Sequence, residues 1–322
     1  MALVAMSLGL ISFGLPATAS TAAPTPPPTQ PATQGSIVFV DDETGLPQML
    51  VMQPDGGTSA SALTNGLASD HGPANISPVW SPDAQEIAFV SCAKDGTNCY
   101  LYVMNNDGSL VRQITKKTEE YGGVSWSPDG KTLVYASRFD PGGFPNLYTI
   151  PSDGSADPQQ LGTDDLSGWW PSWSPDGKLI AYQAVGGGNT TINVVNADGT
   201  NSQALTGAAG VIDLDPVWSP DEKSIAFIRG SNNKYAVYMM DADGKNQKRL
   251  TDLFPDPNPK ATEALKLPAL AWSPDGSSIV FNTHKTAKWE LDRVDVKNPL
   301  NVHRILIVSA VAYSPSWTSW QP

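Results

Sequence analysis

Short apolar runs separated by polar turn residues follow one another from Gly35 to the C-terminus. Between residues 77 and 115 these runs cover residues 78–80, 87–90, 101–104 and a last pair at 114–115. They are rich in β-branched and aromatic residues and alternate only partly, which is typical of strands in sheets that pack face to face. Ser-Pro-Asp follows the first run and Asp107-Gly108 the third, and both favour tight turns. We therefore predict a unit of four antiparallel strands, A to D.

This unit repeats along the chain. The tetrapeptide Trp-Ser-Pro-Asp occurs five times, with successive tryptophans 45 to 54 residues apart, and a degenerate sixth copy spans residues 313–318. A period of about 40–45 residues indicates four-stranded propeller blades. Because equivalent residues in a repeat have equivalent structural roles, we expect the tryptophans to fill the space between blades and the aspartates to cap turns. The five copies begin at Trp80, Trp126, Trp173, Trp218 and Trp272.

The residue after each tetrapeptide should take the left-handed conformation that closes such a turn. Glycine, which adopts this conformation without steric cost, stands there in three copies, at Gly130, Gly177 and Gly276. Ala84 and Glu222 replace it in the other two.

The two ends of the repeat region are incomplete in a complementary way. Residues 37–40, 49–52 and 63–64 read as strands B, C and D without an A, and residues 315–320 read as an A alone. Together they complete one blade and remove an open sheet edge. We therefore predict an all-β, six-bladed β-propeller over residues 35–322, with four antiparallel strands per blade, closed by joining the C-terminal strand to the N-terminal three.

The N-terminal segment indicates export. Residues 1–19 resemble a signal peptide, with an apolar run too short to span a membrane comfortably and a small-residue cleavage pattern at 17–19. No lysine or arginine precedes the run, so an uncleaved anchor is the alternative. Residues 20–34 are rich in proline and threonine and read as a disordered tether. We expect a secreted or periplasmic protein, tethered to the envelope if the segment is retained and otherwise without direct membrane insertion.

The two cysteines agree with export. Cys92 and Cys99 flank a short polar segment between two predicted strands, where a hairpin would bring them opposite each other. We expect them to form a disulfide, which persists in oxidising compartments.

Net charge limits the partners. The formal charge is −12, and no charged residue precedes Asp41, so the imbalance belongs to the repeat region. Nucleic acids and anionic membrane surfaces require basic patches and are not expected. A protein or peptide partner, particularly a basic one, suits the charge, although solubility alone would also explain it. We expect a monomer.

The repeated motifs resemble those of a known family. Trp-Ser-Pro-Asp-Gly, then Ile-Ala-Phe, then Tyr-Val-Met before Asp-Gly, then Leu-Thr, are similar to the TolB-like propeller repeat and to the propeller portions of dipeptidyl and acylaminoacyl peptidases. The peptidases also carry an α/β-hydrolase domain, whereas this sequence contains no Gly-x-Ser-x-Gly nucleophile elbow. The resemblance implies a fold more strongly than a function.

Candidate ligand-binding residues lie in the variable loops between strand D of one blade and strand A of the next. Such loops surround one mouth of the central channel, and binding residues usually lie on variable loops held by a rigid scaffold. Several carboxylates could form a negative ring there that holds a divalent cation or a basic side chain. The alternatives are solvated carboxylates and, for the tryptophans, packing between blades. The candidates are Asp70, His71, Glu119, Glu120, Tyr121, Asp164, Asp165, Trp169, Trp170, Asp213, Asp215 and Asp256.

These features favour an exported, non-catalytic module that binds a protein or peptide through the loop face and channel mouth. No catalytic residue, metal site or resident cofactor is assigned. One alternative is a polysaccharide lyase or hydrolase with acidic loop residues as acid and base. The scattered His71, His284 and His303 do not match the histidine-rich metal site that a resemblance to oligogalacturonate lyases would imply. The other alternative is a cell-surface scaffold without a specific small ligand.

Overall fold

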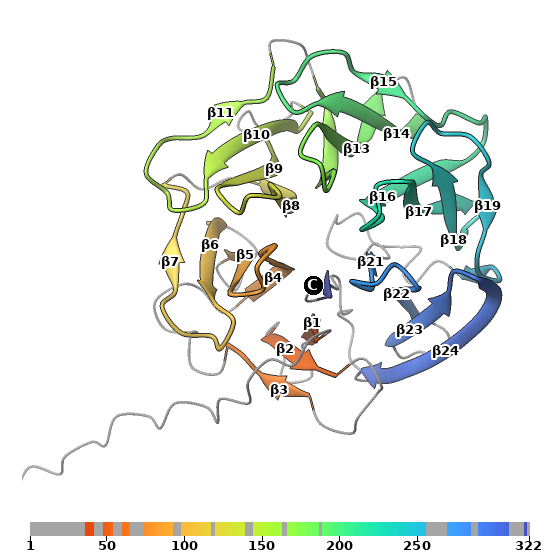
Figure 1. Cartoon of the computed structure of the whole chain (residues 1–322), viewed down its shortest axis with the longest axis horizontal. Helices are drawn as coiled ribbons and strands as arrows, with labels where there is room; N and C mark the ends of the chain where they lie inside the picture. Colours follow the sequence, from red (N-terminus) through yellow and green to blue (C-terminus); the bar gives the residue numbers. More distant parts are fainter. Residues whose placement is uncertain are drawn as a thin grey trace, which may run out of the picture.

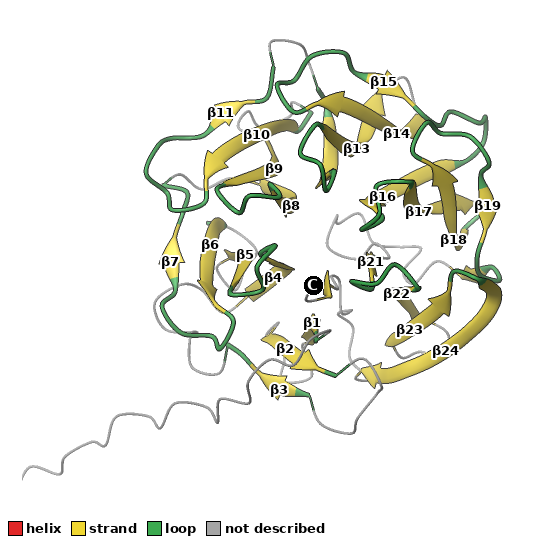
Figure 2. Ribbon diagram, in the orientation of Figure 1, coloured by secondary structure: helices red, strands yellow, loops and turns green. Residues whose placement is uncertain are grey.

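Sheets of antiparallel strands surround a central axis like the blades of a propeller (Figure 1). The computed structural model describes residues 36–41, 48–53, 60–64, 74–92, 98–116, 120–138, 144–162, 166–186, 189–255, 269–284, 289–308 and 319–320. Within these residues the secondary structure consists of strands joined by turns and loops (Figure 2). None of the described segments forms a helix of the length and apolarity that a membrane span requires.

Three sheets contain four strands in the predicted order along the chain. In each sheet the first strand lies nearest the axis and the fourth at the rim (Figure 1). The first sheet comprises β4 (Ala74–Trp80), β5 (Glu86–Cys92), β6 (Tyr100–Asn105) and β7 (Arg112–Gln113). The second comprises β8 (Glu120–Trp126), β9 (Thr132–Arg138), β10 (Asn146–Pro151) and β11 (Gln159–Gln160). The third comprises β21 (Leu270–Trp272), β22 (Ser278–His284), β23 (Trp289–Asp295) and β24 (Asn298–Val308).

Two further four-stranded units are joined into one sheet. They are β12 (Gly168–Trp173), β13 (Leu179–Gly186), β14 (Asn189–Asn196) and β15 (Gln203–Ala204), then β16 (Ile212–Trp218), β17 (Ser224–Ser231), β18 (Lys234–Asp241) and β19 (Lys248–Arg249). A single parallel pair, Thr190 with Ile212, joins them. The short β20 (Phe254–Pro255) pairs with the first two residues of β18.

The remaining sheet combines strands from the two ends of the sequence. Its order is β25 (Ser319–Trp320), β1 (Ile37–Asp41), β2 (Gln48–Met52) and β3 (Ser61–Ala62). Ile37 pairs with Trp320 and Val38 with Ser319, in antiparallel register. Residues 315–318, which were also expected in this strand, lie outside the described part of the chain.

Each Trp-Ser-Pro-Asp tetrapeptide closes the turn between the first two strands of its unit. In the first copy, the Ser81 hydroxyl donates to Asp83 Oδ1 at 2.6 Å and accepts from the backbone amide of Glu86 at 2.9 Å. The same serine–aspartate bond recurs at 2.6 to 2.8 Å in the other four copies. The Ser81 hydroxyl bond lowers the pKa of Asp83, so the carboxylate that caps the turn is ionised at neutral pH. The turn-capping role predicted for the repeated aspartates is confirmed.

The residue after the tetrapeptide is left-handed in all five copies. The φ angles are 71° at Gly130, 75° at Gly177 and 67° at Gly276. Ala84 and Glu222 adopt the same conformation, with φ of 57° and 64°, although they carry a Cβ atom. The turn therefore imposes its geometry whichever residue occupies this position, as predicted.

The repeated Leu-Thr or Ile-Thr pair that follows the outermost strand has a specific role. In four units the threonine hydroxyl accepts a hydrogen bond from a backbone amide of the third strand. The bonds measure 2.9 to 3.1 Å and join Thr64 to Met49, Thr115 to Leu101, Thr206 to Ile192 and Thr251 to Val237. Each threonine thus satisfies a buried amide that strand pairing leaves open.

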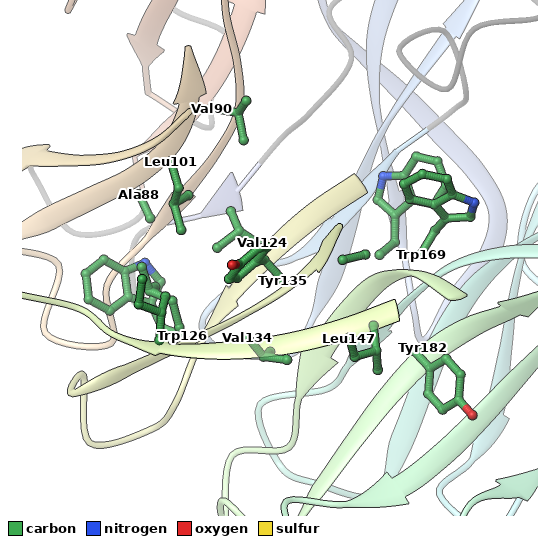
Figure 3. Close-up of a cluster of buried hydrophobic side chains, with 14 of the residues drawn as sticks. Ala88, Val90, Leu101, Val124, Trp126, Val134, Tyr135, Leu147, Trp169 and Tyr182 are labelled. Carbon is green, nitrogen blue, oxygen red and sulfur yellow. The ribbon is translucent and has the colours of Figure 1, made fainter. Parts of the chain in front are cut away.

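The predicted packing of tryptophans between neighbouring units is confirmed for Trp80, Trp126, Trp218 and Trp272, the last of which clusters with residues of β16 to β18. Trp126 of β8 belongs to a buried cluster with Ala88 and Leu101 of the preceding sheet (Figure 3). Trp80 packs in a cluster with residues of β1 and β2, and Trp218 in one with residues of β13 and β14. Trp173 differs, because it is only partly buried and its indole donates to the Gly177 carbonyl of its own turn at 3.1 Å.

The predicted disulfide is present. Cys92, at the end of β5, and Cys99, just before β6, are joined by an S–S bond of 2.02 Å. Both cysteines are buried in the cluster that also contains Trp126. The disulfide therefore links the two middle strands of this sheet.

Candidate functional site

The innermost strands share an irregularity that shapes the wall of the central channel. In β4, β8, β12 and β16 one extra residue interrupts the pairing with the next strand, which defines a β-bulge. The residue three positions before the tryptophan of each tetrapeptide has a positive φ in these strands: Ser77 (54°), Gly123 (87°), Trp170 (48°) and Asp215 (47°). Left-handed conformations at residues other than glycine are costly and recur at functional sites. The bulges therefore lie in strands that face the central channel (Figure 1).

A cavity of about 360 Å³ lies along this axis between the innermost strands. Five of the tryptophans near the axis line it, namely Trp80, Trp126, Trp170, Trp218 and Trp272, together with the turn prolines Pro82, Pro175, Pro220 and Pro274. Because these prolines belong to the tetrapeptide turns, the cavity reaches the face that carries those turns. Sequence reasoning had pointed to the opposite face.

Asp215 is the one charged residue among the described residues that line the cavity. Its side chain is 8% exposed, and its Oδ2 accepts a hydrogen bond of 2.8 Å from the backbone amide of Leu270, on β21 of the neighbouring unit. Burial raises the pKa of Asp215 to about 7, although the Leu270 hydrogen bond acts in the opposite direction. The cavity therefore contains a carboxyl group that changes charge near neutral pH.

Asp213, two residues earlier on β16, is placed very differently. Its carboxylate is fully buried and accepts two hydrogen bonds from the Arg229 guanidinium, at 2.7 and 2.9 Å. Arg229 also lies over the rings of Phe227 and Tyr238, at 5.1 and 5.0 Å from their centroids. This bidentate geometry and the ring contacts are those of a structural ion pair that fixes β16 against β17.

Trp169 and Trp170, on β12, are buried in the cluster that also contains Trp126, and the two residues are 9% and 5% exposed. The Trp169 ring occupies the space that a Cβ atom at Gly122 would need, and the Arg138 guanidinium lies 5.8 Å from the ring centroid. Figure 3 shows Trp169 among the side chains of this cluster. Trp170 packs beside Gly123 and also lines the cavity. A ligand contact by either residue stays a prediction.

Most other candidates fall outside the described residues: Asp70, His71, Glu119, Asp164, Asp165 and Asp256. Glu120 and Tyr121 are at the start of β8. The structure thus places Asp215 and Trp170 on one cavity, whereas it pairs Asp213 with Arg229. Across the described ranges, no three His, Cys, Asp or Glu side chains are arranged to hold a metal ion.

The bulge position is the structural feature of the channel wall that the sequence analysis did not predict. It lies three residues before the tryptophan and is occupied by Ser77, Gly123, Trp170 and Asp215, whereas β21 pairs with β22 in regular register. Variation at one fixed position of an otherwise regular repeat is the signal that could have identified it. Asp215 was selected from the sequence only as one of many loop acids.

The repeat matches an established family model. Residues 63–258, more than half of the chain, match the family described as the TolB beta propeller domain. The chain belongs to this TolB β-propeller family. The matched range contains the disulfide, four of the five tetrapeptides, the four bulges and Asp215.

Solved structures agree with this TolB β-propeller assignment at the level of the fold. TolB from Acinetobacter baumannii aligns with a TM-score of 0.65 and 20% identity, over 89% of this chain and 67% of that one. A putative TolB from Agrobacterium tumefaciens aligns with a TM-score of 0.60 and 20% identity, over 90% and 99% of the two chains. An oligogalacturonate lyase in complex with manganese aligns at 0.54 and 18% identity, over 84% and 73%. The TM-scores show that the fold is shared, whereas identities this low do not transfer a function.

No curated protein matches the sequence of this TolB β-propeller chain.

Proposed function

We propose that this chain is an exported, non-catalytic binding module that recognises a protein or peptide at the mouth of its propeller channel. In this proposal β1, β2, β3 and β25 form the sixth blade of a closed ring, which gives the channel a continuous wall. The loop face predicted from the sequence would extend the contact around the opposite mouth. The supporting observation is the channel cavity, which combines tryptophan and proline surfaces with serine hydroxyls and one carboxylate.

The chemistry of this lining suits recognition of an extended peptide. Tryptophan and proline supply rigid apolar surface, which binds side chains at a low entropic cost. The buried indole N–H of Trp218, beside the cavity, donates to no residue within the described ranges, whereas those of Trp126 and Trp272 donate to backbone carbonyls at 3.2 and 3.0 Å. Most of the described aspartates are already engaged in turn caps, and Asp213 is paired with Arg229. The arrangement therefore favours binding over acid–base chemistry.

Export has its own support. The disulfide between Cys92 and Cys99 suits an oxidising compartment, and residues 1–19 have the composition of a signal peptide. We propose a secreted or periplasmic location, and a monomer in solution.

Calorimetric titration of the purified chain tests the function. The ligands are capped decapeptides of basic, neutral and acidic composition, oligogalacturonides, and Mn²⁺. We expect at least one peptide class to bind with a defined stoichiometry, and the oligogalacturonides to show neither binding nor cleavage. Cleavage of an oligogalacturonide would contradict the proposal and support the lyase alternative. Absence of binding to every ligand would favour a scaffold.

A further inference from the structure

Among the described residues that line the channel cavity, Asp215 is the one that carries a charge. Apart from Asp215, its described lining consists of tryptophan, proline, serine, glycine, valine, alanine and leucine residues. A lone carboxylate in such surroundings is poorly solvated. A positively charged group that reaches it therefore has a stronger electrostatic attraction to it than it would have to a carboxylate at the protein surface.

Asp215 is held in a defined orientation. Its φ of 47° is left-handed, a conformation that is costly for a residue with a Cβ atom, and it directly precedes Pro216. The amide of Leu270 fixes Oδ2, whereas no described residue forms a hydrogen bond to Oδ1. One oxygen of the carboxylate is therefore anchored between two units and the other is left for a ligand that enters the cavity.

No cation of the described chain neutralises Asp215. On β17, Arg229 donates two hydrogen bonds to Asp213 and forms an ion pair with it. The described residues of β12 and β21, the strands on either side of β16 at the axis, include no titratable side chain. Asp215 thus has neither an opposite nor a like charge facing it from these elements.

We propose that the channel binds the side-chain cation of a lysine or arginine, with Asp215 as its counter-charge and the surrounding tryptophans as the apolar wall. This rests on the proposed function, because the cation belongs to the bound peptide. Aromatic faces attract ammonium and guanidinium groups, so the same wall accommodates both the aliphatic part and the charged end of such a side chain.

The inference predicts selectivity between two ligands that differ in one charge. The probes are the capped pentapeptide Gly-Ser-Lys-Ser-Gly and its analogue with norleucine in place of lysine. At pH 8 and low salt, the full chain should bind the lysine peptide about tenfold more tightly or better, as expected for a charged hydrogen bond formed in a poorly solvated site. At pH 5.5, where Asp215 is mostly protonated, this preference should fall to near unity.

Two variants locate the effect. Asp215→Asn keeps the shape of the side chain and an acceptor for Leu270, and it should abolish the preference for lysine. Asp198→Asn removes the same charge from an exposed turn and should leave the preference unchanged. Melting temperatures of both variants establish that they are folded. Equal affinity for the two peptides in the unmodified chain, or a lysine preference that survives Asp215→Asn, overturns the inference.

A third probe separates this inference from the proposed function. Millimolar n-butylammonium should raise the melting temperature of the unmodified chain and not that of Asp215→Asn. If this shift occurs but no peptide binds, the cation site stands and peptide recognition fails. If peptides bind irrespective of charge and n-butylammonium has no effect, peptide recognition stands and the cation site is overturned. If neither probe binds, both are rejected.

Discussion

The hydroxyl oxygen of Thr115 accepts a hydrogen bond of 3.0 Å from the backbone amide of Leu101, fourteen residues earlier in the sequence. Both groups are buried, and the same bond recurs in three other units. The repeated threonine therefore satisfies a backbone amide of the adjacent strand in each of these units.

We expect Thr115→Val to lower the free energy of unfolding by about 1–3 kcal/mol, because the shape is kept while a buried amide loses its acceptor. Thr115→Ser retains the hydroxyl and should lose less than half as much. Urea denaturation of the three proteins measures the difference. Equal losses in the two variants would show that packing of the methyl group, and not the hydrogen bond, stabilises this position.

Glu222 offers a stabilising substitution. Its φ of 64° is left-handed, whereas glycine occupies the equivalent position in three other turns. We expect Glu222→Gly to raise the free energy of unfolding by about 1 kcal/mol, since it removes the steric cost of that conformation. Gly130→Ala is the converse control, because a Cβ atom there meets nothing within 4 Å and only the backbone conformation changes. It should lower the stability by a similar amount in the same denaturation experiment.

The stability of the fold should fall as pH rises through the titration of Asp215. The pKa is raised from 3.8 to about 7 in the folded chain, so the folded state binds this proton more tightly than the unfolded state. The stabilisation that protonated Asp215 gives the folded state is complete below pH 3.8. It is lost progressively up to about pH 7, which lowers the free energy of unfolding by an amount on the order of 4 kcal/mol.

The variant Asp215→Asn isolates this contribution, because an amide does not titrate and its oxygen can still accept from Leu270. Chemical denaturation at intervals from pH 4 to pH 8 should show a smaller decline for the variant than for the unmodified chain. The variant should also be more stable than the unmodified chain at pH 8. Parallel curves for the two proteins would mean that Asp215 titrates normally.

The disulfide closes a loop with a sequence separation of seven residues. Restricting the unfolded chain over a loop of this size contributes about 2.5 kcal/mol in the chain-entropy model. We expect the Cys92→Ser/Cys99→Ser variant to melt at a lower temperature, and reductant to lower the melting temperature of the unmodified chain only. A drop in the variant upon adding reductant would point to an effect of the reductant unrelated to this bond.

The strand order and the turns could be predicted because their causes are local. Ser81, Pro82 and Asp83 interact within one turn, and the same three residues recur in every copy, so the sequence alone reveals both the position and the role. The disulfide was predictable for the same reason, since a hairpin joins Cys92 and Cys99.

The burial of Asp215 could not be predicted because its cause is not local. Its partner Leu270 is 55 residues further along the chain, on another unit. Asp213 and Asp215 look alike in the sequence, and only the position of Arg229 and the bulge in β16 distinguish an ion pair from a lone carboxylate. Likewise β24, with eleven residues, is much longer than the two-residue outer strands elsewhere, and no Asp-Gly turn precedes it.

The pairing of Ile37 with Trp320 has a consequence for how the protein reaches its destination. The sheet that contains β1 cannot be completed until residue 320 has been synthesised, so this sheet stays incomplete during nearly all of translation. Contacts between residues this distant in sequence form slowly, because a long loop must close first. Under the proposed export, this late pairing would keep this sheet incomplete until the C-terminal residues had crossed the translocation channel.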